Sequence, residues 1–244
     1  MSEKHIFAFY TDFFIVPGPN TTHEIHDQEL MRRLSTVLRM KPNEPLILFD
    51  KTHIVHAELL FFAKKFLRIY VKNIEIQQPL SPAVTLILPL LKRQALEEAV
   101  YSAVEIGVNT IQLVVTHKSQ QSITQKEFDR LQAVIIAAAE QSKNYVLPVL
   151  QKPLAYKDSI ASFDNSKALK IVCDPAGASL IDLLQAKNNK KNLDILVLMG
   201  PESGFMPEEL DLALSHNFFQ VKLTQGVLRA LQAVAVSLGI IRSL

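Results

Sequence analysis

Cysteine, glycine and long apolar runs are all scarce in this sequence. The single cysteine, Cys173, excludes a framework of disulfide bonds within the chain. The longest uncharged apolar stretches, such as residues 195–199, are far shorter than the roughly 20 residues that a membrane-spanning helix needs. The N-terminal residues lack a basic segment followed by a long apolar run, which is the pattern of a secretory signal. We therefore expect a cytoplasmic protein with no membrane partner.

The chain also lacks an excess of charge of either sign. It has 26 lysines and arginines against 24 aspartates and glutamates, a net charge of +2 over 244 residues. Overall charge therefore does not indicate nucleic acid, and a nucleic-acid binder would have to gather its positive charge on one face. With 48% hydrophobic and 20% charged residues, the composition excludes a disordered chain. The length fits one large domain or two small ones.

Two regions with different patterns follow each other along the chain. The first 76 residues predict short apolar and aromatic strands around one helix at 29–38, with the strands at 5–9, 13–16, 45–49, 54–60 and 67–76. This pattern is typical of a small β-barrel or sandwich. Residues 77–82 (QQPLSP) are polar and contain two prolines, so we place a linker there between domains at 1–76 and 83–244.

The second region predicts strands that alternate with helices. A Thr124–Glu127 capping box opens one helix, and Pro207 stands in the first turn of another. The expected strands are 84–88, 110–115, 169–173, 195–199 and 218–223, and the expected helices are 91–106, 124–142, 179–186, 207–215 and 230–244. This alternation favours an α/β fold with a mostly parallel sheet.

Three of the seven glycines, Gly200, Gly204 and Gly226, fall close together near the C-terminal end. They lie in two strand–loop–helix segments, and the loops after parallel strands meet at one edge of a sheet, where ligands bind in open α/β folds. Arg229 precedes the last helix, whose N-terminus is already its positive end, so the residue fits an anion or a polarised carbonyl in front of it. Two ordinary strand–helix turns and a surface arginine are the alternatives.

Several other kinds of site are not supported. The sequence contains no P-loop motif and no G-x-G-x-x-G motif, so neither nucleotide site of these types is expected. His53 and His56 are three residues apart in a predicted strand and therefore point to opposite faces, which argues against a shared metal. Cys173 ends an apolar strand and is read as a buried structural thiol.

An ordered set of short segments resembles one family. Residues 200–205 (GPESGF), followed by Pro207 and two glutamates, resemble its GPEGGF…E loop, and residues 221–229 resemble its segment ending in ILR. Further matches, in the same order as in the family, are VLR at 37–39, Lys92, EIGV at 105–108, and AAEQS at 138–142 with Pro148. The chain thus resembles the ribosomal RNA small subunit methyltransferase E family, the uracil-N3 methyltransferases of 16S ribosomal RNA.

This resemblance implies a fold. The family has an N-terminal PUA-like β-barrel that helps to hold RNA and a C-terminal α/β SPOUT domain with a deep trefoil knot, and it works as a homodimer. Knots are rare among protein folds, so the knot is expected from the resemblance alone. Residues 230–244 are apolar on nearly every face, which is typical of a helix buried in a core or an interface and so agrees with a dimer.

The resemblance also implies a cofactor and its site. S-adenosyl-L-methionine would be held largely by main-chain groups, since glycines let the backbone approach a ligand closely. The cofactor-binding residues expected from the family are Leu198, Gly200, Pro201, Glu202, Gly204, Leu223, Gly226 and Leu228.

The implied reaction is methyl transfer from a sulfonium to N3 of a uridine, which needs no metal. The partner would be small-subunit ribosomal RNA or the assembled subunit. Loss of the N3 proton spreads negative charge onto O2 and O4, and Arg229 is the residue expected to stabilise it. The uridine must be unpaired or flipped out. The residues expected to bind RNA are Arg32, Arg33, Arg39, Lys41 and Lys92, with a solvated charged surface as the alternative.

The sequence departs from the family pattern at several positions of these segments. Ser203 and Thr224 stand where the family has glycines, Leu231 and Gln232 replace a Glu-Thr pair, and Asn144 replaces an arginine. These departures leave two further hypotheses beside the enzyme. One is a divergent, weak or inactive member that binds RNA. The other is an unrelated α/β enzyme of a small metabolite, which would have no affinity for RNA.

Overall fold

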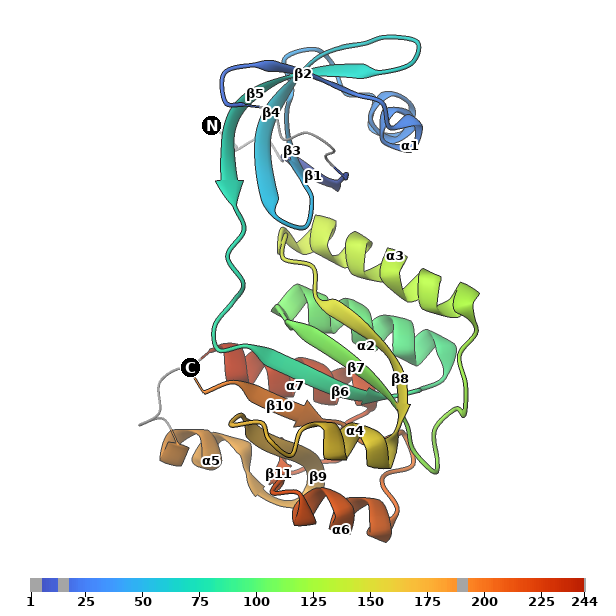
Figure 1. The fold of residues 1–244 in the computed structure, drawn as a ribbon, viewed down its shortest axis with the longest axis vertical. Coiled ribbons are helices and arrows are strands. Elements are labelled where there is room, and N and C mark those ends of the chain that lie inside the picture. Colours follow the sequence, from blue (N-terminus) through green and yellow to red (C-terminus); the bar gives the residue numbers. More distant parts are fainter. Residues whose placement is uncertain (1–5, 13–17, 188–192, 244) are drawn as a thin grey trace. The chain divides into compact units, whose positions relative to one another are not determined.

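The computed structural model describes residues 6–12, 18–187 and 193–243, so the strand expected at 13–16 lies outside the described residues. The chain divides into two compact units, Met1–Gln78 with Ala139–Val146, and Pro79–Ala138 with Leu147–Leu244, and each contains its own sheet (Figure 1). Residues 139–146 fold with the first unit although they follow the predicted linker at 77–82 in the sequence. A division of the chain at this linker alone does not account for them. The division into independent domains at 1–76 and 83–244 stays a prediction.

The first unit is a five-stranded sheet with a short helical segment. The elements are β1 (Phe7–Tyr10), β2 (Thr22–Ile25), α1 (Gln28–Arg32), the π-helical turn η1 (Arg33–Val37), β3 (Pro45–Phe49), β4 (His53–Phe62) and β5 (Leu67–Ile76). Asp27 caps α1 by accepting a hydrogen bond from the backbone N–H of Leu30 at 2.9 Å. Leu30 and Leu34 then pack into the apolar core with the buried residues of the strands. The helix expected at 29–38 is therefore present, with its second half wound as a π-turn.

The strand order of this sheet is β1-β3-β4-β5-β2, with β1 parallel to β3 and the other pairs antiparallel. Among the described residues, no ladder joins the edge strands β1 and β2. The described strands of this unit therefore form an open sheet, since each of these four-residue edge strands pairs on one side only, and the PUA-like β-barrel stays a prediction.

The second unit has a six-stranded, all-parallel sheet. Its strands are β6 (Val84–Pro89), β7 (Thr110–Val115), β8 (Val149–Ala155), β9 (Leu169–Ser179), β10 (Ile195–Leu198) and β11 (Phe219–Lys222). Its helices are α2 (Arg93–Ile106), α3 (Gln125–Ser142, whose last turn belongs to the first unit), α4 (Tyr156–Ser162), α5 (Leu180–Lys187), α6 (Pro207–Ser215) and α7 (Ala230–Arg242). The predicted α/β class with a parallel sheet is confirmed.

The order of this sheet, β11-β9-β10-β6-β7-β8, positions the site. The chain runs outward from β6 to β8, crosses to β9 on the other side of β6, and then returns to place β10 between β9 and β6. The strand order therefore reverses next to β6 and β10. Crevices at such points, outside the carboxyl ends of the strands, are the usual ligand sites of open parallel sheets.

Helices cover the sheet so that its central strands are buried. Tyr156 and Ile160 of α4 and Ala213 of α6 pack in one cluster with Leu196 and Leu198 of β10. Helices α2 and α7 lie side by side (Figure 1). All four residues of β10 are buried, as expected for an inner parallel strand.

Candidate active site

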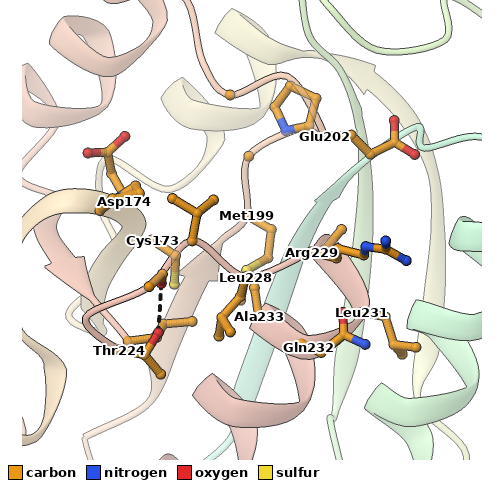
Figure 2. Close-up of a pocket in the computed structure, with 18 of the residues that line it drawn as sticks. Cys173, Asp174, Met199, Glu202, Thr224, Leu228, Arg229, Leu231, Gln232 and Ala233 are labelled. Carbon is orange, nitrogen blue, oxygen red and sulfur yellow. Dashed lines mark hydrogen bonds between the residues drawn. The ribbon is translucent and has the colours of Figure 1, made fainter.

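A cavity of about 600 Å³ lies at the carboxyl ends of β10 and β11 and beside the middle of β9. Three segments of the chain form most of its wall: Cys173–Pro175 within β9, the loop after β10, and the loop from β11 into α7. Ala95 and Glu98 of α2 complete the lining. Figure 2 shows Asp174, Cys173 and Thr224 toward one side of the cavity and Arg229, Leu231 and Glu202 toward the other. The two glycine-containing loops singled out in the sequence therefore share one cavity.

Seven of the eight residues expected to bind the cofactor line this cavity. They are Gly200, Pro201, Glu202, Gly204, Leu223, Gly226 and Leu228. The eighth, Leu198, does not line it, because its side chain is fully buried in the core beneath the sheet. The next residue, Met199, contributes to the wall instead. The role of each of these residues toward a cofactor stays a prediction.

Two glycines shape the loop after β10. Gly204 has a φ of 74°, in the left-handed region that a side chain disfavours, and its N–H closes a turn onto the carbonyl oxygen of Pro201 at 2.8 Å. At Gly200 an added Cβ would lie 3.2 Å from the ring of Phe205, so the loop folds over this position closely. The backbone is therefore what the loop presents to the cavity.

Glu209 of α6 fixes this loop from behind. One carboxylate oxygen accepts the N–H of Met206 at 2.9 Å, and the other accepts the N–H of His117, in the loop after β7, at 2.7 Å. The backbone oxygen of Glu209 accepts the hydroxyl of Tyr156 at 2.8 Å. Burial of this tyrosine and the nearby charge of Glu209 raise its pKa, so it remains a donor at neutral pH. Lys118 adds a contact at 3.4 Å to the carbonyl oxygen of Ser203. The loop after β10 is thus tied to the loop after β7.

Exchanging Glu209 for glutamine is expected to weaken binding of the cofactor by roughly tenfold. Glutamine has one carbonyl oxygen, so one of the two N–H groups loses its acceptor and faces an NH₂ group, at about 1–3 kcal/mol. Titration calorimetry with S-adenosylmethionine measures the change. Glu208→Gln, an exposed change at the adjacent position, is the matched control. Equal affinities in the two variants would contradict a bracing role for Glu209.

Arg229 is positioned by the start of α7. It is the N-cap residue, with extended backbone and no side-chain capping bond, and its carbonyl oxygen accepts the N–H of Ala233 at 2.9 Å. Its exposed side chain lines the cavity together with those of Glu98 and Glu202. A guanidinium beside the positive end of a helix makes this side of the cavity suited to an anion or a polarised oxygen.

Other lining residues were not expected from the sequence. Asp174 is held in place because its carboxylate accepts the N–H of Ala176 and the side-chain amide of Gln220, both at 2.9 Å. Cys173 is only partly buried and borders the cavity, so the prediction of a buried thiol is wrong. Desolvation by its surroundings still raises the pKa of the thiol to about 12, which keeps it protonated at neutral pH. In the sequence, both residues could have been expected at the site because they lie at the end of the strand predicted at 169–173.

The departures from the family pattern fall in different places. Thr224 lines the cavity and donates its hydroxyl to the carbonyl oxygen of Gly226 at 2.7 Å, shown as the dashed line in Figure 2. Leu231 and Gln232 also line the cavity. Ser203 is exposed, and Asn144 belongs to the first unit. Three of these departures therefore bear directly on the site.

The residues expected to bind RNA are divided between the two units. In the first unit, Arg32 pairs with Glu29 and Arg33 makes a two-point ion pair with Glu140 at 2.6 and 3.0 Å. The pKa of Arg33 is raised mainly by its hydrogen bonds to that carboxylate. Exposed side chains at Arg39 and Lys41 lie in the same unit.

Lys92 lies in the second unit, as the exposed N-cap residue of α2. It stands three residues before Ala95, so it shares the helix face that borders the cavity.

Two kinds of feature do not occur among the described residues. No three His, Cys, Asp or Glu side chains there gather as metal ligands; His53 pairs with Asp50 and His56 with Glu75. In the same part of the chain, no helix has the length and apolar character to span a bilayer.

The part of the chain that holds the parallel sheet matches a known family. The family model of the RNA methyltransferase domain matches residues 78–242, about two thirds of the chain, and the chain belongs to this family.

More particularly, the chain is similar to ribosomal RNA small subunit methyltransferase E. The protein of that name from Rickettsia conorii is 26% identical over 228 residues, covering 92% of this chain and 91% of its own. The Synechocystis protein of the same name is 27% identical over 254 residues, covering 100% and 82%.

Solved structures agree over the whole length. The Neisseria gonorrhoeae ribosomal RNA small subunit methyltransferase E bound to S-adenosyl methionine is 25% identical, with a TM-score of 0.83 over 98% of both chains. A putative methyltransferase from Legionella pneumophila, with bound S-adenosylmethionine, shares the fold at 23% identity, with a TM-score of 0.82 over 98% of both chains. The predicted family resemblance is confirmed, and the hypothesis of an unrelated metabolite enzyme is wrong.

Proposed function

We propose that this chain transfers a methyl group from S-adenosylmethionine to N3 of a uridine in small-subunit ribosomal RNA. The observation that carries the proposal is the single cavity in which the loops after β10 and β11 meet Arg229. Relatives over nearly the whole chain are named ribosomal RNA small subunit methyltransferase E, and one of them binds S-adenosyl methionine. Such a protein acts where ribosomal RNA is, which for this chain is the cytoplasm.

The residues of the cavity fit this cofactor. Its volume of about 600 Å³ falls within the range of roughly 300–1,000 Å³ typical of small-molecule sites. At Gly204 and Gly226 an added Cβ would meet no atom within 4 Å, so open space lies before the backbone there. Leu223, Leu228 and Ala95 offer apolar contacts for an adenine ring, and backbone groups of both loops can read its edge. We assign cofactor binding to these two loops.

When bound, the cofactor supplies an electrophilic methyl group on a positive sulfur. The neutral uracil ring carries a proton on N3, and its loss spreads negative charge over O2 and O4. The guanidinium of Arg229 donates to these oxygens and stabilises that charge as it forms. Glu98 and Glu202, exposed carboxylates of the same cavity, can accept the proton. Because N3 lies on the pairing edge, the uridine enters unpaired.

The first unit is assigned to RNA binding as a PUA-like module, with Arg39 and Lys41 among its exposed cations. The trefoil knot stays a prediction, supported by the return of the chain to insert β10 between β9 and β6.

The homodimer is likewise proposed. Its support is a groove of about 680 Å³ among α2, α3 and α7, with half-exposed apolar residues of α7. Sedimentation equilibrium tests it against the 27.4 kDa monomer.

Methyl transfer to ribosomal subunits that lack the modification tests the function. With labelled S-adenosylmethionine, we expect label in one uridine of 16S ribosomal RNA, located by primer extension because N3 methylation blocks base pairing. Label at another atom or in another RNA would reject the N3 assignment. Cofactor binding without transfer, together with salt-sensitive RNA binding, would instead support the RNA-binding member of the family.

A further inference from the structure

A group of aromatic rings lies on the first unit, on the face of the sheet that points away from its core. It consists of Phe61, Phe66 and His26 with Arg68, and we call it the hairpin platform, since the β4–β5 hairpin carries most of it. Phe61 is 41% exposed although it is a large apolar side chain. The side chain of His26 is 65% exposed. Rings presented to solvent in a group are uncommon on a surface without a ligand.

The sheet register brings these side chains together. Phe61 of β4 is opposite Arg68 of β5, and Arg68 is opposite Glu24 of β2. Leu67 and Ile69, the neighbours of Arg68 in β5, are fully buried, so Arg68 points to the face away from the core. Phe66 and His26 extend the row just beyond the paired residues. The arrangement follows from three strands, not from a mobile loop.

The rings and the guanidinium of Arg68 are packed against one another. The ring centroids of Phe61 and Phe66 are 6.3 Å apart in an edge-to-face arrangement, and those of Phe66 and His26 are 5.6 Å apart. The guanidinium carbon of Arg68 lies 5.2 Å from the Phe61 centroid and 5.7 Å from that of Phe66. Arg68 also pairs with Glu24, which holds it beside both rings. Planar groups supported in this way are the surfaces on which nucleic acid bases stack.

Charge favours a phosphate backbone beside these rings. The turn between β4 and β5, closed by the Ala63 N–H on the carbonyl oxygen of Phe66 at 2.8 Å, carries the exposed Lys64 and Lys65. The carbonyl oxygen of Lys65 accepts the side-chain amide of Gln28 at 3.1 Å, which attaches the turn to α1. Two lysines at a fixed turn next to stacked rings combine the two features of single-strand sites.

Two of the cations expected from the sequence to bind RNA, Arg32 and Arg33, are less available to a phosphate than Lys64 and Lys65 are. Arg32 and Arg33 are held by Glu29 and Glu140, and the guanidinium of Arg33 also lies 5.0 Å from the ring centroid of Phe9. A phosphate would have to displace these carboxylates. Within the described residues, no carboxylate forms an ion pair with the exposed Lys64 or Lys65, so a phosphate there displaces none.

We propose that the hairpin platform binds unpaired nucleotides of the RNA substrate, with bases stacked on Phe61 and Phe66 and phosphates at Lys64 and Lys65. This inference rests on the proposed function, since it takes RNA as the substrate. It assigns to the first unit a contact that supplies affinity through stacking as well as charge.

The absence of tryptophan in the chain allows a direct test. Phe61→Trp introduces the only tryptophan of the chain into the platform, and its emission, excited where tyrosine does not absorb, should be quenched on titration with a ten-nucleotide oligouridylate. Phe7→Trp is the matched control. Phe7 is 37% exposed in β1, at the opposite edge of the same sheet, and its variant should show no quenching. Circular dichroism and the melting temperature establish that both variants fold.

Affinity measurements separate stacking from charge. By fluorescence anisotropy, Phe61→Ala should weaken binding of the labelled oligonucleotide by about 5- to 150-fold, with the salt dependence unchanged. Should Phe61→Ala fold poorly, Phe61→Leu keeps apolar bulk and lacks the ring. Replacing Lys64 and Lys65 with glutamine should lower the slope of log affinity against log salt by about 0.7 each. Cofactor binding should be unaffected in all of these variants.

The other outcomes separate the failure of the platform from the failure of the proposed function. Binding without quenching at position 61 places the RNA elsewhere, and equal quenching at positions 61 and 7 means contact over the whole sheet. An emission change that depends on protein concentration without RNA means that the face meets a second copy. If the wild-type enzyme methylates 16S ribosomal RNA but RNA does not quench the tryptophan emission of Phe61→Trp, only the platform is rejected. Quenching in a chain that transfers no methyl group rejects the proposed function alone.

Discussion

Replacing Arg229 with alanine is expected to slow methyl transfer by about 100- to 1,000-fold. The removed guanidinium is the donor that faces the charge forming on the uracil oxygens, so its loss raises the barrier without altering the fold. The side chain is exposed and makes no capping bond, and the backbone oxygen that receives the Ala233 N–H remains in the variant. Stability should therefore change by no more than about 0.5 kcal/mol.

The measurement is single-turnover methyl transfer at saturating RNA, with cofactor affinity from calorimetry. Arg229→Lys should recover only part of the rate, because an ammonium is a point charge without the planar set of donors. Raising the pH should reduce the difference in methyl-transfer rate between the wild type and Arg229→Ala, because N3 of the uridine then ionises without the guanidinium. A defect of folding would give the same difference in rate at every pH. Arg93→Ala removes an exposed arginine outside the cavity and serves as control. If Arg229→Ala transferred the methyl group at the wild-type rate, Arg229 would have no role in the mechanism.

Local signals predicted the helices well where side-chain chemistry defines an end. The Thr124 hydroxyl accepts the backbone N–H of Glu127 and the Glu127 carboxylate accepts the backbone N–H of Thr124, as a capping box requires, and α3 begins at the next residue. Gly107 ends α2 with a φ of 91°, as a helix-terminating glycine should. These signals act within four residues, so they can be read without the fold.

The elements that were missed lack such signals. Strand β8 lies at the sheet edge with most of its residues exposed, and it includes Pro153, so no apolar run marks it. Strand β9 continues beyond residue 173 because its ladder with β11 resumes at Ala178 after an interruption. Pro175 and Gly177 lie in the interrupted part and read as a loop in the sequence. Tertiary pairing determines both features.

The site was predicted in the same uneven way. Loops after parallel strands meet at one edge, so the residues around Gly200 and Gly226 could be placed together from the pattern alone. The contribution of Glu98 could not, since the position of α2 beside α7 depends on packing. The partner of Arg33 was equally hidden, because Glu140 lies 107 residues along the chain and belongs to α3. Contacts of this kind require the coordinates.

Gly177→Ala is expected to destabilise the second unit and to weaken cofactor binding together. An added Cβ would lie 2.4 Å from the backbone nitrogen of Val221 and 2.5 Å from the carbonyl carbon and oxygen of Gln220. These are main-chain atoms of β11, so no side-chain rotation relieves the contact and the strand must move. Overpacking of this kind costs about 1–3 kcal/mol, which lowers the melting temperature of a protein of this size by about 2–12 °C.

The movement of β11 extends to the cavity because Leu223 directly follows the strand and the loop to Arg229 continues from it. We therefore expect the Kd for S-adenosylmethionine to rise at temperatures where the variant is fully folded. Calorimetric melting and cofactor titration at 15 °C give the two effects separately. Gly18→Ala is the control, since its Cβ would meet Thr21 at an ordinary 3.6 Å. A variant that melts lower yet binds the cofactor like the wild type would show that β11 can shift without disturbing its loop, and the cavity would then depend on α7 and the loop after β10 alone.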